Sequence, residues 1–156
     1  MIYDREKAIA YARKWAYGRN PAYYNFDALG GDCTNFVSQC LYAGCGVMNY
    51  TRDVGWYYSS SYDRAAAWSG VEYLYTFLTA NKKAGPYASE RPIEEAQPGD
   101  IIQLSFNGVT FGHSLFVVRA EPAILISTHT DDWDSRALKT YRFQKARLIH
   151  IEGVRR

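Results

Sequence analysis

One cysteine stands where the sequence predicts the start of a helix. The stretch GGDCTNFVSQCL, residues 30–41, places Cys33 after two glycines and Asp32, and ahead of an apolar stripe at helical spacing. Asp32 is expected to cap the first turn, and the unpaired N–H groups and dipole of a helix start favour a thiolate. Cys33 is therefore a candidate nucleophile with a lowered pKa. The alternative is a packed thiol, an interpretation that suits Cys40 and Cys45 better.

A nucleophilic cysteine needs a base held close to it, and the sequence has three histidines. His113 begins the apolar run HSLFVV, and His129 closes the run LISTHTDD. A hairpin between these runs would bring both imidazoles to one end of a sheet, so Cys33, His113 and His129 form a candidate set of nucleophile, base and orienting group. His150, in the last strand-like run, is interpreted as a hydrogen-bonded or surface histidine, which is also the alternative for the other two.

Aromatic residues crowd the loops around the cysteine, and aromatic walls with hydroxyl tips suit peptide or glycan ligands. Trp56, in the segment GWYYSSSY, is the first candidate for a substrate contact, together with Tyr24 and Asp32. The alternative for each aromatic residue is packing against the helices. The backbone N–H of Cys33 is the expected first donor to an oxyanion, and the side chain of Tyr24 or Asn25 is a candidate second donor.

The sequence indicates neither a metal nor a disulfide framework. Asp131, Asp132 and Asp134 form an acidic turn, which is more often a solvated loop than a metal site. The three cysteines are an odd number with spacings that match no zinc pattern. We expect no cofactor and assign no metal.

The elements that would position these residues follow an α+β order, with helices first and a strand meander afterwards. Asp4 is expected to cap a helix over 5–17, a second helix runs from Cys33 to Gly44 or Gly46, and a third is centred on 71–78. An irregular insertion, 47–67, separates the second helix from the third. Strand-like runs are predicted at 101–106, 113–119, 123–128, 138–143 and 146–151.

Length and composition predict one domain, residues 1–156, with a core of its own. A formal net charge of +2 argues against nucleic acid as a partner, and the apolar runs are too short for a membrane span. The N-terminus lacks the basic flank and apolar core of a signal peptide, so the chain as written is expected to be cytoplasmic, with action at a cell wall or outside the cell left open. The sequence makes no prediction about oligomeric state.

The motif DCTNFVSQCL resembles the signature of the putative amidase domain family, small relatives of the NlpC-type cell-wall peptidases, in which the corresponding stretch runs Asp-Cys-Ser-Gly-Phe-Val. Further segments resemble the family in the same order: YDREKAIAYARKWA, NPAYYNFD, QPGDIIQL, GHSLFVV and STHTDD. The resemblance implies a papain-like fold in the circularly permuted NlpC-type order, with the cysteine helix before the sheet.

The resemblance also implies roles for single residues. Cys33 would be the nucleophile, His113 the general base and later acid, and His129 the orienting group, with Asp131 or Asp132 as alternatives for that third role. We expect a thiolate–imidazolium pair that cleaves an amide bond in a cell-wall peptide or a related short peptide. Two alternatives remain open: a non-catalytic module that binds a peptide or glycan on the same fold, and an acyl transferase that uses the same pair.

Overall fold

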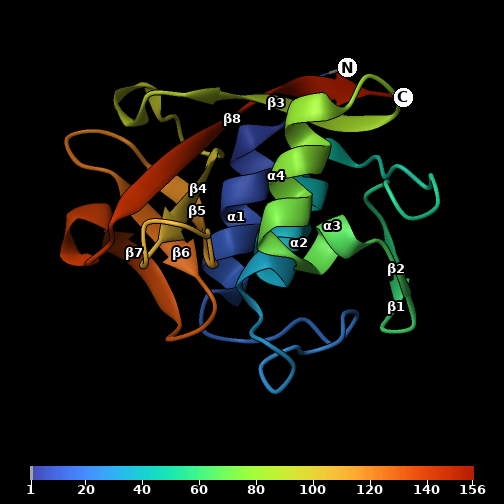
Figure 1. Ribbon diagram of the computed structural model, residues 1–156, viewed down its shortest axis with the longest axis horizontal. Helices are drawn as coiled ribbons and strands as arrows, with labels where there is room; N and C mark the ends of the chain where they lie inside the picture. Colours follow the sequence, from blue (N-terminus) through green and yellow to red (C-terminus); the bar gives the residue numbers. More distant parts are fainter. Residues whose placement is uncertain (1) are drawn as a thin grey trace.

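The computed structural model describes residues 2–156 and confirms the α+β order: N-terminal helices followed by a six-stranded antiparallel sheet (Figure 1). The helices are α1 (Arg5–Trp15), α2 (Cys33–Cys45), α3 (Ala66–Ser69) and α4 (Val71–Ala80). The strands of the large sheet are β3 (Gly85–Arg91), β4 (Ile101–Ser105), β5 (His113–Arg119), β6 (Leu125–Thr128), β7 (Trp133–Ala137) and β8 (Lys145–Arg155). In residues 2–156 no helix is long and apolar enough to cross a membrane.

The two N-terminal helices form where local signals predict them. The side chain of Asp4 accepts a hydrogen bond from the Lys7 amide at the start of α1. Helix α2 ends at Gly46, whose φ of 67° is the left-handed conformation that a helix stop favours. Gly44 lies inside α2 at the crossing with α1, where an added Cβ would lie 2.6 Å from the carbonyl oxygen of Asp4. The close packing of α1 on α2 therefore depends on this glycine.

The large sheet has the strand order β3-β8-β4-β5-β6-β7. Strands β4 to β7 form the predicted meander, but β8 returns past them to lie between β3 and β4. The two edge strands, β3 and β7, were not predicted from the sequence. The predicted strand over 138–143 is wrong, because the 3-10 helix η2 (Leu138–Thr140) occupies its first half. Edge strands carry proline and polar residues, so β3 and β7 lack the apolar alternation of a buried strand.

The insertion 47–67 is largely irregular, as predicted. It contains a short hairpin, β1 (Tyr58–Ser60) and β2 (Asp63–Arg64). The helix α3 follows this hairpin directly. The hairpin lies at the side of the molecule opposite β7, while α1, α2 and α4 stand between it and the sheet (Figure 1).

The two faces of the sheet pack against different partners. Phe116 and Val118 of β5 belong to the core shared with the helices, whereas Leu115 and Val117 belong to a second core on the other face. Because side chains alternate along a strand, this division fixes the directions at the start of β5. Ser114 lies on the helix face, where its hydroxyl is 2.9 Å from the hydroxyl of Thr34. His113 lies on the opposite face.

Candidate active site

Cys33 is the first residue of α2 and is preceded by a loop with an unusual backbone. Gly30 and Gly31 have φ values of 87° and 101°, which glycine adopts without strain. The Gly31 amide donates to the carbonyl of Phe26, and the Phe26 amide donates to the carboxylate of Asp32. These hydrogen bonds join the two ends of the loop over residues 26–32, here called the approach loop, immediately before Cys33.

The Cys33 thiol is buried, with 8% of the residue exposed, and lies against the backbone of Ser114, the second residue of β5. Its sulfur is 3.8 Å from the hydroxyl of Thr34. Burial raises the pKa of the Cys33 thiol, while hydrogen bonding from the backbone of Ser114 and from Thr34 works in the opposite direction without reversing the shift. The predicted lowering of the Cys33 pKa is thus wrong for this structure, because the cost of burying a thiolate is larger than the effect of these hydrogen bonds.

His113 is the first residue of β5 and pairs with Leu104 of β4. Its ring centroid is 6.1 Å from that of Tyr141 and 6.3 Å from that of Phe106. Burial, and to a smaller extent the charge of Arg136, lowers the pKa of His113 to about 4, against an opposing effect of Asp131. The imidazole is therefore neutral at pH 7. Within residues 2–156 no hydrogen bond joins His113 to Cys33, so the expected thiolate–imidazolium pair is absent from this structure.

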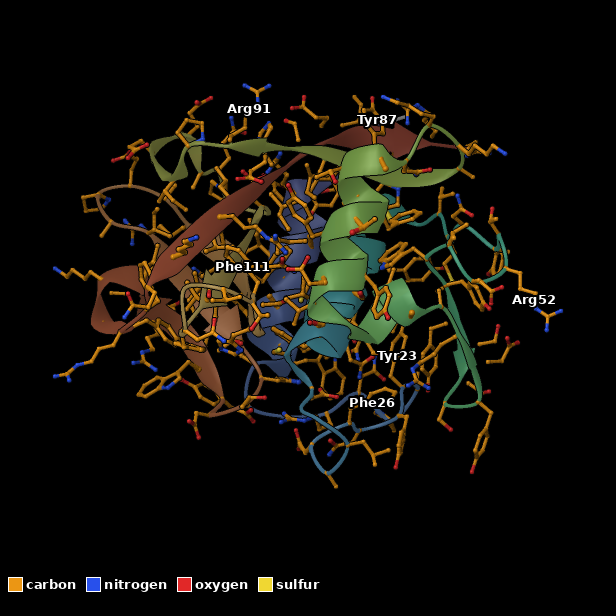
Figure 2. The ribbon with its side chains drawn as sticks, in the orientation of Figure 1. Tyr23, Phe26, Arg52, Tyr87, Arg91 and Phe111 are labelled. Carbon is orange, nitrogen blue, oxygen red and sulfur yellow. The ribbon has the colours of Figure 1, made fainter. Side chains whose placement is uncertain are left out.

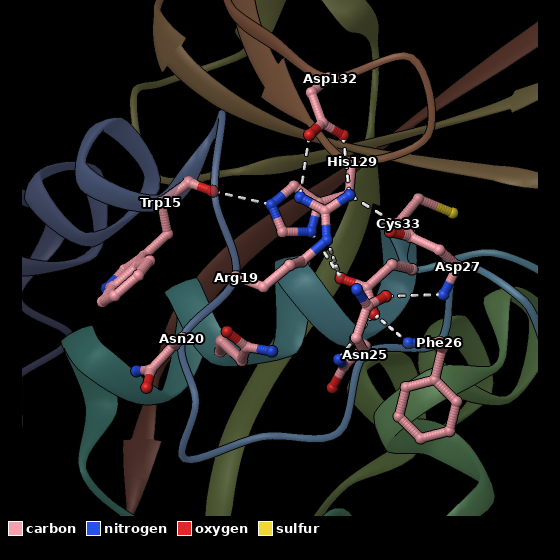
Figure 3. A network of polar contacts seen from close by, with 12 residues as sticks. Trp15, Arg19, Asn20, Asn25, Phe26, Asp27, Cys33, His129 and Asp132 are labelled. Atoms are coloured by element: carbon pink, nitrogen blue, oxygen red, sulfur yellow. Dashed lines mark hydrogen bonds and ion pairs between the residues drawn. The ribbon is translucent and has the colours of Figure 1, made fainter.

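His129 lies at the same end of the sheet as His113, as the predicted hairpin of β5 and β6 requires. Its surroundings are different. Its ring stacks on Phe36 of α2 with centroids 4.0 Å apart. Nδ1 lies 2.5 Å from a carboxylate oxygen of Asp32, and Nε2 lies 2.8 Å from the carbonyl oxygen of Trp15 (Figure 3). Both ring nitrogens therefore already have hydrogen-bond partners.

Asp32 occupies the N-cap position of α2, but its side chain does not make the predicted capping hydrogen bond. The carboxylate is fully buried and accepts from the Phe26 amide and from the side chain of Asn35, 2.8 and 2.9 Å away. Burial works to raise the pKa of Asp32, but the hydrogen bonds from His129, Asn35 and Phe26 outweigh it and leave the pKa lowered. Asp32 cannot touch a substrate from this position, so its predicted substrate contact is wrong.

Trp56 is also wrongly predicted as a substrate contact. It is fully buried, its indole N–H donates to the hydroxyl of Ser38, and its ring packs on Trp68 with centroids 4.7 Å apart. Tyr24 is 38% exposed and packs edge-on against Phe26, so its substrate contact stays a prediction. Figure 2 shows Phe26 at the end of the molecule where this loop lies.

An open hollow of about 650 Å³ lies beside the loop that leads to Cys33, between residues 19–31 and residues 130–132. The lining residues are Arg19, Asp27, Gly30, Gly31, Thr130, Asp131 and Asp132. Arg19, which was not predicted as a site residue, binds Asp132 at 2.9 Å and Asp27 at 3.1 Å. A single arginine in a loop carries no pattern that would reveal these partners. A second, more apolar hollow of about 460 Å³ lies between α4 and the insertion and includes none of the candidate catalytic residues.

Comparison with known proteins agrees with the resemblance of the motifs. The chain is 37% identical over 138 residues to the uncharacterized protein YhbB of Bacillus subtilis (strain 168), an alignment that covers 86% of this chain and 43% of YhbB. The chain thus spans less than half the length of this relative. No solved structure matches this chain significantly. The model of the putative amidase domain matches residues 2–152, nearly the whole chain, and the chain therefore belongs to the putative amidase domain family.

Proposed function

We propose that the chain is a thiol amidase in which Cys33 attacks an amide carbonyl and His113 serves as base and then acid. One observation carries the proposal: in a chain of the putative amidase domain family, the only cysteine at a helix start within residues 2–156 lies against the backbone of Ser114, the residue that follows His113. The family supports an amide substrate. A papain-like, circularly permuted fold fits the order of cysteine helix and sheet, and is part of the proposal.

The resting site holds a neutral thiol and a neutral imidazole, because burial raises the pKa of Cys33 and lowers that of His113. We propose that proton transfer accompanies attack: the thiol proton passes to the imidazole as sulfur bonds to the carbonyl carbon, and His113 then protonates the leaving amine. The two groups must come within about 3 Å for this step, and such contacts are often looser before substrate binds. His113 directly precedes Ser114, whose backbone lies against the thiol, but the His113 side chain points to the opposite face of the sheet, so the proposed transfer requires the imidazole to turn toward the sulfur when substrate binds.

The orienting role that the resemblance implies for His129 has two alternatives, Asp131 and Asp132. Asp132 is bound by Arg19, whereas the charge of Asp131 acts on His113 and works to raise its pKa. We therefore assign the orienting role to Asp131. The backbone N–H of Cys33 at the helix start is the proposed first oxyanion donor.

We propose a peptide substrate, with cell-wall peptides as the first class to test. The assay measures release of free amine from a panel of muropeptides and short peptides. The matched variants are Cys33→Ala and Cys45→Ala, since both remove a buried cysteine from α2. We expect Cys33→Ala to abolish turnover and Cys45→Ala to retain it.

The same assay separates the other two functions. If hydroxylamine is added and a hydroxamate accumulates without net hydrolysis of the substrate, the enzyme is an acyl transferase. Full turnover by Cys33→Ala would contradict the nucleophile, and binding of the panel without turnover by the wild type would favour a non-catalytic binding module.

A further inference from the structure

We propose that His129 is a positioning residue for Cys33. His129 holds the first turn of α2 through Asp32, and it does not orient His113. The inference rests on the proposed function only in taking Cys33 as the nucleophile. It assigns the two histidines at this end of the sheet to different partners.

The sheet itself separates the two histidines. Phe116 of β5 pairs with Ser127 of β6, and extending this register places Ser114 opposite His129. Opposed residues on antiparallel strands point to the same face. His129 therefore shares the helix face with Ser114, which is consistent with its stacking on Phe36. His113 points to the other face, beside Tyr141. Figure 3 shows the sulfur of Cys33 directed away from the His129 ring.

Both partners of the His129 ring are hydrogen-bond acceptors. The carboxylate of Asp32 faces Nδ1 and the carbonyl of Trp15 faces Nε2, so both ring nitrogens are engaged within the fold. The geometry thus fits a ring that donates its Nδ1–H to Asp32. Arg19 is a cation near this pair, with Nε 3.6 Å from Asp32, and it is itself bound by Asp132.

The contacts of Asp32 carry the effect to the nucleophile. Its carbonyl accepts from the Phe36 amide at 2.9 Å, which closes the first turn of α2. Its carboxylate holds the Phe26 amide of the approach loop and the Asn35 side chain. The Cys33 backbone N–H, the proposed oxyanion donor, lies between these anchors. His129 also ties this turn to the end of α1 through Trp15, so it joins three segments at the site.

The first test uses the wild type and needs no variant to fold. Long-range ¹H–¹⁵N correlation spectra of the histidine rings at pH 7 should show that Nδ1 of His129 carries the proton that Asp32 accepts. A bare Nδ1 on His129 would overturn the proposal, because the ring could then not hold the Asp32 carboxylate.

The second test compares His129→Gln with Asp131→Asn and with His150→Gln. His150 is the matched control. Its Nδ1 also contacts a buried aspartate, Asp100 at 2.9 Å, but this pair includes no residue of α2. His129→Gln should speed amide hydrogen exchange at residues 34–36 by about tenfold or more, since it removes a charged hydrogen bond. His150→Gln should not change exchange there. If His129→Gln fails to fold, Asp32→Asn is measured in its place.

The titration of the His113 ring separates positioning of Cys33 from orientation of the base. Asp131→Asn should lower the titration midpoint of His113, and His129→Gln should leave it in place. A shift in His129→Gln as large as that in Asp131→Asn, or exchange at 34–36 equal to that in His150→Gln, would overturn the proposal. These readouts do not use turnover. Activity retained by Cys33→Ala would therefore refute the proposed function and leave the placement of His129 to be judged by the spectra.

Discussion

Replacing His113 should remove a specific part of the pH dependence of stability. Burial lowers the pKa of His113 from 6.5 to about 4, so the native ring stays neutral over a range in which the unfolded ring binds a proton. The unfolded state therefore takes up more protons as the pH falls from 6.5 to 4, and stability is lost over that window. Above pH 6.5 the residue contributes no pH dependence, because both states are neutral.

The size of the effect follows from the two pKa values. At pH 4.5 the unfolded ring is almost fully protonated and the native ring only partly so, which corresponds to about 2–3 kcal/mol. His113 is 8% exposed, so solvent screens this difference little. Between pH 7 and pH 4.5 the free energy of unfolding should therefore fall by about 2–3 kcal/mol more in the wild type than in His113→Gln.

Urea unfolding at closely spaced pH values, monitored by tryptophan fluorescence, measures both curves. The contributions of the carboxylates are common to both proteins and cancel in the difference. His113→Asn has a different side-chain volume and should give the same difference in slope, because only the lost titration matters. Parallel curves for the wild type and both variants would refute the argument that His113 is buried in its neutral form.

Three further predictions follow from burial at named residues. Iodoacetamide should alkylate Cys33 more slowly at pH 7 than it alkylates a free thiol, and the alkylation rate should increase only at higher pH, because burial raises the pKa of Cys33. Peptide mass spectrometry measures the rate. Fast alkylation at neutral pH would show a thiolate instead. Gly44→Ala should destabilise the protein by about 1–3 kcal/mol despite the better helix propensity of alanine, since the new Cβ meets the Asp4 carbonyl; an unchanged urea midpoint would contradict this contact. Trp56→Phe should lower stability by about 1–3 kcal/mol through the lost hydrogen bond to Ser38 and lost packing, while turnover per folded molecule stays unchanged.

The elements that the sequence predicted correctly are those whose signals are local. The cap of Asp4, the apolar stripe of α2 and the stop at Gly46 all act within one or two helical turns. The inner strands β4 and β5 are buried along nearly their whole length and are therefore rich in apolar residues. Edge strands have no such requirement on one side, which is why β3 and β7 gave no signal. The position of β8 between β3 and β4 depends on pairing across the whole chain, and no local pattern encodes it.

Burial decided which of the predicted site residues were wrong. Trp56 lies in an irregular segment rich in tyrosine and serine, which resembles an exposed loop, but the helices α2 and α3 close over it. Asp32 was correctly placed at the start of α2, but its side chain faces the interior, where His129 and Asn35 satisfy it. Neither outcome can be derived from residue type and spacing, because both depend on which segments pack together.

The two histidines show how the period of a strand limits an argument from spacing. A hairpin fixes the end of the sheet at which two residues meet, and that expectation is confirmed for His113 and His129. The face is fixed by the register, and a change of one residue would exchange the faces. In this register His129 meets α2 and the carboxylate of Asp32, whereas His113 meets an apolar face, where burial keeps it neutral. Both ring nitrogens of His129 are held, by Asp32 and Trp15, whereas His113, the proposed base, is neutral and has to turn toward Cys33 to accept its proton. The register of β5 on β6 thus assigns the two histidines to different surroundings.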